Sequence, residues 1–184
     1  MTDSAATSPV SYPLRVNRLP EKGTTVTIQA DSAQRAALAR LHDLLSVERF
    51  WAELTVRPWK AGGVRVLGRV EADIMQSCVV TLEPIAGRID EDIAATFVPE
   101  GSRLARVEHE GGELVLDPEG EDPPEPFIGD SLDIGALAEE FFALGIDPYP
   151  RKEGVKLDPP EEEAPAEADA GPLARELKKL RDRY

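Results

Sequence analysis

Three long runs in the middle of the chain alternate apolar and polar residues, and this pattern limits the possible folds more than any other feature. The apolar positions are Phe50, Ala52, Leu54 and Val56 in the first run; Val64, Val66, Gly68, Val70, Ala72 and Ile74 in the second; and Ile85, Ile89, Ile93, Ala95 and Phe97 in the third. Successive side chains in a strand point to opposite faces, so each run predicts a strand with one buried face. We expect at least three long antiparallel strands between residues 50 and 98.

Two helices are predicted to cover the apolar face of this sheet. The first begins at Asp31, an N-cap residue with Gln34 in the capping-box position, and its apolar stripe consists of Leu38, Leu41 and Leu45. The second follows Asp130 or Ser131 as a cap, ends at Gly145, and carries its apolar residues at Leu132, Ala136, Phe141 and Leu144. Long strands with one solvated face tend to curl over such helices. The predicted fold class is therefore α+β, with a strongly twisted antiparallel sheet that is a candidate for partial closure and two packed helices.

Composition divides the chain into four parts. Residues 1–10 are small and polar and predict a disordered tail. Residues 11–157 form the predicted α+β domain, in which strand-like segments at 12–19 and 24–30 precede the first helix and a mobile acidic loop occupies 99–126. Residues 158–171 are an acidic, proline-rich linker. Residues 172–184 predict a basic amphipathic helix, a candidate docking helix whose main positions are Leu173, Leu177, Lys178, Lys179, Leu180 and Arg181.

The residues that usually carry chemistry are too few and too scattered to predict an enzyme. The chain has one cysteine, Cys78, and two histidines, His42 and His109, in separate regions. A zinc site needs several such ligands at workable spacing, and a cysteine nucleophile needs a nearby base. A buried thiol at a strand end is the better interpretation of Cys78, and an exposed or capping role is expected for His42. We expect no catalytic residue, no metal and no cofactor.

The sequence also indicates a compartment. Its N-terminus lacks the charged and apolar regions of a signal peptide, and no stretch approaches the roughly 20 apolar residues that a membrane span requires. A single cysteine cannot form an internal disulfide, which fits a reducing environment. We expect a cytoplasmic protein with no membrane partner.

The segment "CVVTLEPI", the strand that ends in "ATFVPE", and "DSLDIGALAEEFFALGIDPYPR" together resemble the YceD family over roughly residues 12–155. The matching positions are Cys78, Leu82, Pro84, Asp133, Gly135, Leu137, Leu144 and Pro148, with Glu139 or Glu140 also in the second motif. Thr81 stands where family members often carry a second cysteine, so this chain cannot assemble a thiolate cluster there. The resemblance implies an accessory protein needed for large-subunit, 23S-type ribosomal RNA to accumulate in bacteria and plastids, and it carries over no catalytic residue.

An RNA-related role has to be reconciled with a formal net charge of -14, which repels phosphate. One interpretation is that acidic segments contact a basic ribosomal protein or a pre-ribosomal large-subunit particle. The other is direct RNA contact, which the net charge disfavours, through a local patch of Arg57, Lys60, Arg65 and Arg69. The solvated rim of a sheet is the plainer interpretation of those four residues. A small-molecule-binding or general protein-interaction domain, and a hydrolase that uses His109, remain the alternatives.

Overall fold

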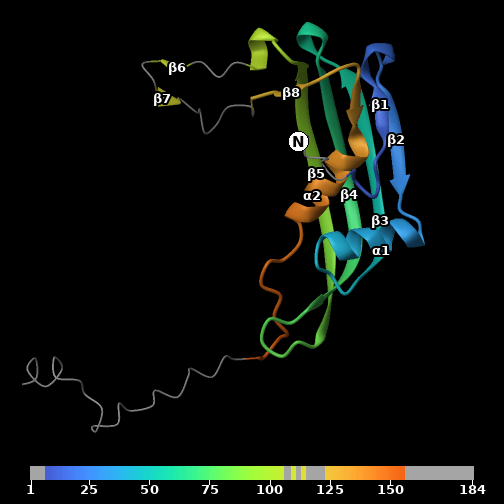
Figure 1. The fold of residues 1–184 in the computed structure, drawn as a ribbon, viewed down its shortest axis with the longest axis vertical. Coiled ribbons are helices and arrows are strands. Elements are labelled where there is room, and N and C mark those ends of the chain that lie inside the picture. The colour runs from blue at the N-terminus through green and yellow to red at the C-terminus, as the bar shows by residue number, and fades with distance from the viewer. Residues whose placement is uncertain (1–6, 106–108, 111–112, 115–122, 156–184) are drawn as a thin grey trace, which may run out of the picture. The chain divides into compact units, whose positions relative to one another are not determined.

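A five-stranded sheet forms the centre of the computed structural model, which describes residues 7–105, 109–110, 113–114 and 123–155 (Figure 1). Its strand order is β2-β3-β4-β5-β8. The strands are β2 (Thr24–Gln29), β3 (Ser46–Pro58), β4 (Val64–Ser77), β5 (Pro84–Pro99) and β8 (Glu125–Phe127). The pairs β2-β3, β3-β4 and β4-β5 are antiparallel, whereas β8 runs parallel to β5. The α+β class is confirmed, and the sheet is not closed.

Two helices, α1 (Ser32–Leu41) and α2 (Ile134–Leu144), accompany the sheet. Strands β1 (Pro13–Arg15) and β9 (Ser131–Asp133) form a separate antiparallel pair, so β1 does not pair with the strand that follows it. A second small pair joins β6 (His109–Glu110) and β7 (Glu113–Leu114), and the 3-10 turns are η1 (Val16–Arg18), η2 (Lys60–Gly62) and η3 (Arg103–Ala105).

The chain divides into two compact units, residues 1–152 and 153–184, and every element given above lies in the first. None of the helices in the described part of the chain is long and apolar enough to cross a membrane.

The three alternating runs form the three long strands, as predicted. All four apolar residues of β3 are buried, and five of the six in β4 are buried with Gly68 half-buried. Both helices cover this buried face: the Phe142 ring of α2 contacts Phe50 of β3 edge-on at 5.5 Å and the His42 ring after α1 at 5.3 Å. Val66 is fully buried, which confirms the predicted layer of helices on the sheet.

The first helix begins as predicted but ends earlier. Asp31 accepts a hydrogen bond from the Gln34 amide at 2.8 Å and the Gln34 side chain accepts one from the Asp31 amide at 2.9 Å, which completes the capping box. The predicted stripe is wrong beyond Leu38, because Leu41 and Leu45 are 54% and 55% exposed. The helix ends at Leu41, and Asp43 adopts a left-handed conformation with φ 54°. This turn changes the register, so that burial passes to Leu44 and Val47 instead.

The second helix has a different cap from the one predicted. Asp133 is the N-cap, and Ser131 and Leu132 belong to β9 instead. Gly145 ends the helix as predicted. Leu144 is 73% exposed. The buried side chains are Ile134, Leu137, Ala138 and Phe142, together with Glu139, which contacts His42. The N-cap moved because Asp133 is the carboxylate that reaches the free amides of the first turn.

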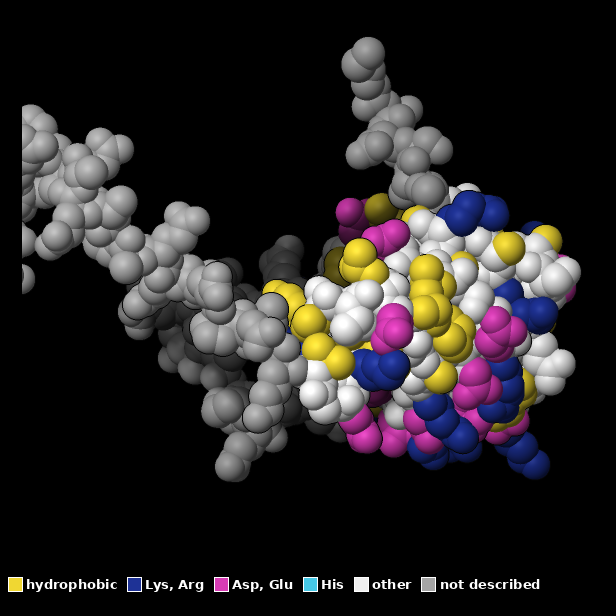
Figure 2. Space-filling view, turned by 90° about the horizontal axis from the view of Figure 1, so that it is seen from below, with side chains coloured by type: hydrophobic (Ala, Val, Ile, Leu, Met, Phe, Trp, Pro, Cys, Tyr) yellow, Lys and Arg dark blue, Asp and Glu magenta, His cyan; other side chains and the backbone are white. Residues whose placement is uncertain are grey.

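Interleaved charges cover the outer face of the sheet. Arg49 pairs with Glu71 at 3.0 Å, Arg88 approaches the same carboxylate at 3.7 Å, and Arg69 pairs with Asp90. In Figure 2, basic and acidic side chains lie side by side along one border of the molecule instead of forming separate fields. The outer face is therefore solvated and largely self-neutralised.

Segments predicted to lack structure are ordered in part. Val10, in the predicted tail, is 1% exposed and belongs to the core. The predicted loop at 99–126 contributes η3, β6, β7 and the start of β8 among its described residues. The predicted linker at 158–171 and the candidate docking helix at 172–184 lie outside the described residues.

Candidate functional site

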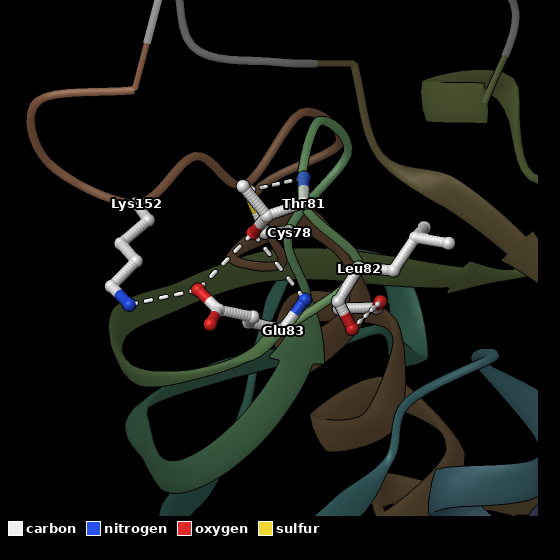
Figure 3. Close-up of polar contacts among 6 residues, drawn as sticks. Cys78, Thr81, Leu82, Glu83 and Lys152 are labelled. Atoms are coloured by element: carbon white, nitrogen blue, oxygen red, sulfur yellow. Dashed lines mark hydrogen bonds and ion pairs between the residues drawn. The ribbon is translucent and has the colours of Figure 1, made fainter.

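The turn between β4 and β5 holds Cys78 in a closed hydrogen-bond arrangement (Figure 3). The Cys78 amide donates to the Glu83 carbonyl at 2.9 Å, and the Leu82 amide donates to the Cys78 carbonyl at 2.9 Å. The Thr81 amide donates to Cys78 Sγ at 3.4 Å. Thr81, the residue that departs from the expected motif, therefore contacts the sulfur as a donor.

A second segment closes over this turn. The Val79 amide donates to the Pro150 carbonyl at 3.0 Å, and Lys152 Nζ lies 2.8 Å from Glu83 Oε2. The Lys152 hydrogen bond lowers the pKa of Glu83 and correspondingly raises that of Lys152. Leu82 points away from this pair, is 76% exposed, and has a left-handed backbone with φ 59°. The turn therefore buries the Cys78 thiol and exposes the Leu82 side chain.

Cys78 combines a lowered thiol pKa with complete burial of its side chain. Hydrogen bonding by the Thr81 side chain lowers the pKa of the thiol to about 6, and the amides of Thr81, Lys152 and Val80 add to this effect against the opposing influence of burial. The side chain is nevertheless 0% exposed. A thiol without solvent contact is not placed to attack a substrate, and the predicted buried role at a strand end is confirmed. No group of three or more His, Cys, Asp or Glu that could hold a metal ion is present in the described part of the chain.

His42 takes the predicted capping position instead of a catalytic one. Its amide donates to the Leu38 carbonyl at the C-terminus of α1, and its Nε2 lies 3.0 Å from Glu139 Oε1 of α2. This contact joins the two helices beside Phe142. His109 lies in β6, far along the chain from both Cys78 and His42.

The second family motif builds the start of α2. Asp133 accepts hydrogen bonds from the amides of Gly135 and Ala136 at 3.0 Å, from the Tyr12 amide at 2.8 Å and from the Ser11 hydroxyl at 2.5 Å. Burial raises the pKa of Asp133, but these hydrogen bonds outweigh it and the pKa is lowered. A Cβ atom at Gly135 would lie 1.9 Å from the Val10 carbonyl oxygen. The motif thus lets residues 10–12 pack directly on α2.

The other motif positions are structural or exposed. Pro84 opens β5 opposite Ser77, and Leu137 is a buried residue of α2. Leu144, the last residue of α2, and Pro148, in the segment that follows the helix, are exposed.

The predicted basic patch is brought together only in part. Arg57 and Arg65 lie opposite each other on β3 and β4, and Lys60 lies on the turn between them, 5.5 Å from the Trp59 ring. Arg69 lies farther along β4 and is engaged by Asp90, which raises the pKa of Arg69. Arg65 makes an interaction of its own.

Two basic residues that sequence reasoning missed lie at the same end of the sheet. The turn at Gly23 packs on the Arg57 side chain, which brings Lys22 beside it. Gly62 approaches Pro99, which brings the loop that carries Arg103 close to η2. We define the basic end as Lys22, Arg57, Lys60 and Arg103, all exposed. The exposed acids Glu21 and Glu100 lie in the same loops. No local pattern predicts this cluster, because it joins three separate turns.

Comparison with known proteins gives the family. Residues 66–183 match the family model described as large ribosomal RNA subunit accumulation protein YceD. The chain belongs to this family, and the predicted resemblance is confirmed. The match begins within β4 and extends past residue 155, so it includes the C-terminal segment but not residues 12–65, which the sequence resemblance also covers. No curated protein and no solved structure matches the chain.

Proposed function

We propose that this protein is a non-enzymatic accessory factor of the bacterial cytoplasm that supports accumulation of 23S-type large-subunit ribosomal RNA by binding a precursor of the large subunit. The observation that carries the proposal is the family match over residues 66–183. The site is consistent with it, because the one thiol is buried and His42 serves a helix contact. Neither group is arranged as a nucleophile or a base.

Charge determines which partners are plausible on a precursor particle. A net charge of -14 favours a basic ribosomal protein over bare RNA. The basic end can still bind phosphate despite the negative net charge. Salt screens acids that lie farther away than a Debye length of about 8 Å, so they do not cancel the lysine and arginine charges there. The proposal therefore combines a protein contact as the main attachment with RNA contact at the basic end as the alternative.

Deletion of the gene tests the function itself. The ratio of large-subunit to small-subunit ribosomal RNA should fall in the deletion strain and recover when the wild-type gene is supplied. An unchanged ratio under several growth conditions would remove the proposed function.

A pull-down from lysate, with and without RNase, separates the two attachments. Capture of ribosomal proteins that survives RNase indicates a protein contact, and capture that RNase abolishes indicates RNA. The double variant Arg57→Glu with Lys60→Glu should weaken only RNA-dependent capture. Arg49→Glu with Arg88→Glu is the matched control, because it also reverses two outer-face cations but leaves the basic end intact.

A further inference from the structure

The long strand β5 has one edge that is almost entirely unpaired within the described residues. One side of β5 pairs with β4 from Pro84 to Pro99 without a register shift. The other side pairs with β8 over Phe97–Pro99 alone. An exposed strand edge presents a row of backbone donors and acceptors that can pair with another chain.

The free part of the edge faces a groove. The Glu100 amide donates to the Phe127 carbonyl on the β8 side of β5. Backbone groups alternate sides along a strand, so the amides and carbonyls of Ala94 and Thr96 point to the same side, beyond the end of β8. Both residues line a cavity of about 430 Å³. Their small side chains leave the backbone accessible.

Helix α2 supplies the apolar wall of this groove. Leu137, Phe141 and Leu144 line it, and Leu144 is 73% exposed. Pro123 and Glu125, which lead into β8, line it as well. An added strand would therefore continue along the line of β8, with alternate side chains directed at α2.

Negative charge surrounds the groove. Glu125 and Glu140 line it and are exposed, and the neighbouring edge residues Glu91 and Asp92 are exposed as well. The Asp92 side chain is 86% exposed, and its Oδ1 atom lies 3.9 Å from Arg69 Nε. Arg65 also lines the groove and already makes an interaction of its own. These charges favour a cationic ligand.

We propose that the free edge of β5 and the adjoining face of α2 bind an extended, basic segment of a partner protein by strand addition. Backbone hydrogen bonds to Ala94 and Thr96 would hold the segment, alternate apolar side chains would contact Leu137, Phe141 and Leu144, and its cations would face the surrounding carboxylates. The inference rests on the proposed function only for the identity of the partner, a basic protein of the precursor particle.

Binding of a fluorescein-labelled decapeptide of alternating lysine and valine to the full chain tests the proposal. Fluorescence polarisation should show saturable binding. A fully N-methylated peptide with the same side chains should fail to bind, because it keeps the charge but donates no backbone hydrogen bond. Hydrogen exchange should slow at Ala94 and Thr96 when the unmodified peptide binds.

Three variants locate the site. Ala94→Pro removes an edge amide without touching the β4 ladder, and Leu144→Ser and Glu140→Lys change only exposed side chains of α2. Each should weaken binding about tenfold, or ~1.4 kcal/mol. Leu41→Ser, at an exposed leucine on α1, should bind like the wild type.

Equal binding of the methylated peptide, or wild-type affinity in all three variants, would overturn the proposal. The carboxylates would then serve only to prevent aggregation through the unpaired strand edge. Binding of a labelled RNA oligomer at the same residues in place of the peptide would also overturn it. These results are independent of the ribosomal RNA ratio, so failure here can be told apart from failure of the proposed function.

Discussion

Asp133 connects the N-terminal segment to the second helix through a single carboxylate. It caps α2 through two amides and at the same time accepts from Ser11 and Tyr12. Its sequence context, "SLDIG", predicts a helix start but not the second set of donors, which come from more than a hundred residues earlier. Local sequence therefore identified the motif and left its tertiary role open.

Replacement of Asp133 by alanine should lower the free energy of unfolding at pH 7 by about 1–2 kcal/mol, the usual loss for an N-cap. The folded pKa of Asp133 is lowered, so its stabilisation is present above the unfolded pKa of about 3.9 and is lost as pH falls through the folded pKa. Urea titrations from pH 7 to pH 3 should show the difference from wild type shrinking below about pH 4. Asp130→Ala, three residues earlier, is the control, and a difference that stays constant with pH would contradict the assignment.

Cys78 should be unreactive in the native protein although its pKa is lowered to about 6, because its side chain has no solvent contact. Ellman's reagent should modify it slowly at pH 7.5 and rapidly in denaturing urea. Fast modification of the folded chain, at the rate of an unfolded control, would show that the turn opens and that the thiol is available.

Elements with a strict period were predictable, and their ends were not. The strands β3, β4 and β5 follow from alternation alone, since a one-residue slip would expose every buried side chain. The end of α1 depends on Asp43 adopting a left-handed conformation, which the helical spacing of Leu41 and Leu45 conceals. The parallel pairing of β8 with β5 depends on a long connection and has no signature in its three residues.

Gly68 shows how closely two of these strands approach. A Cβ atom there would lie 2.1 Å from the Glu53 carbonyl oxygen and 2.8 Å from Leu54 Cα. Gly68→Ala should therefore displace β3 and lower the free energy of unfolding by about 3 kcal/mol, at the upper end for overpacking. Gly87→Ala on β5, where the nearest atom would be a flexible side-chain carbon of Ile74 at 3.1 Å, should stay within about 1 kcal/mol of wild type. Equal urea midpoints for the two variants would contradict this reading of the contact.

At the scale of the whole molecule, the sequence identifies the charged residues but does not show which of them lie together in the folded protein. Arg57 and Lys60 are neighbours in any hairpin, whereas Lys22 and Arg103 join them only because separate turns converge at one end of the sheet. The acidic groove likewise combines β5, α2 and the residues before β8. Both surfaces depend on long-range topology, which single-sequence periodicity does not encode.

We predict that the C-terminal residues 172–184 contribute to binding of precursor particles and not to the stability of the fold. Among the described residues the buried core extends from Val10 to Phe142, and we predict that removal of residues 172–184 leaves the melting temperature nearly unchanged. The same residues carry Arg175, Lys178, Lys179, Arg181 and Arg183 in a chain that is otherwise acidic, and the family match reaches residue 183. We expect truncation after Gly171 to weaken co-sedimentation with large-subunit precursor particles and to reduce its dependence on salt, because fewer phosphates are neutralised. A full-length chain with these five cations changed to glutamine should behave like the truncated one. A large drop in melting temperature with co-sedimentation intact would instead give the segment a structural role.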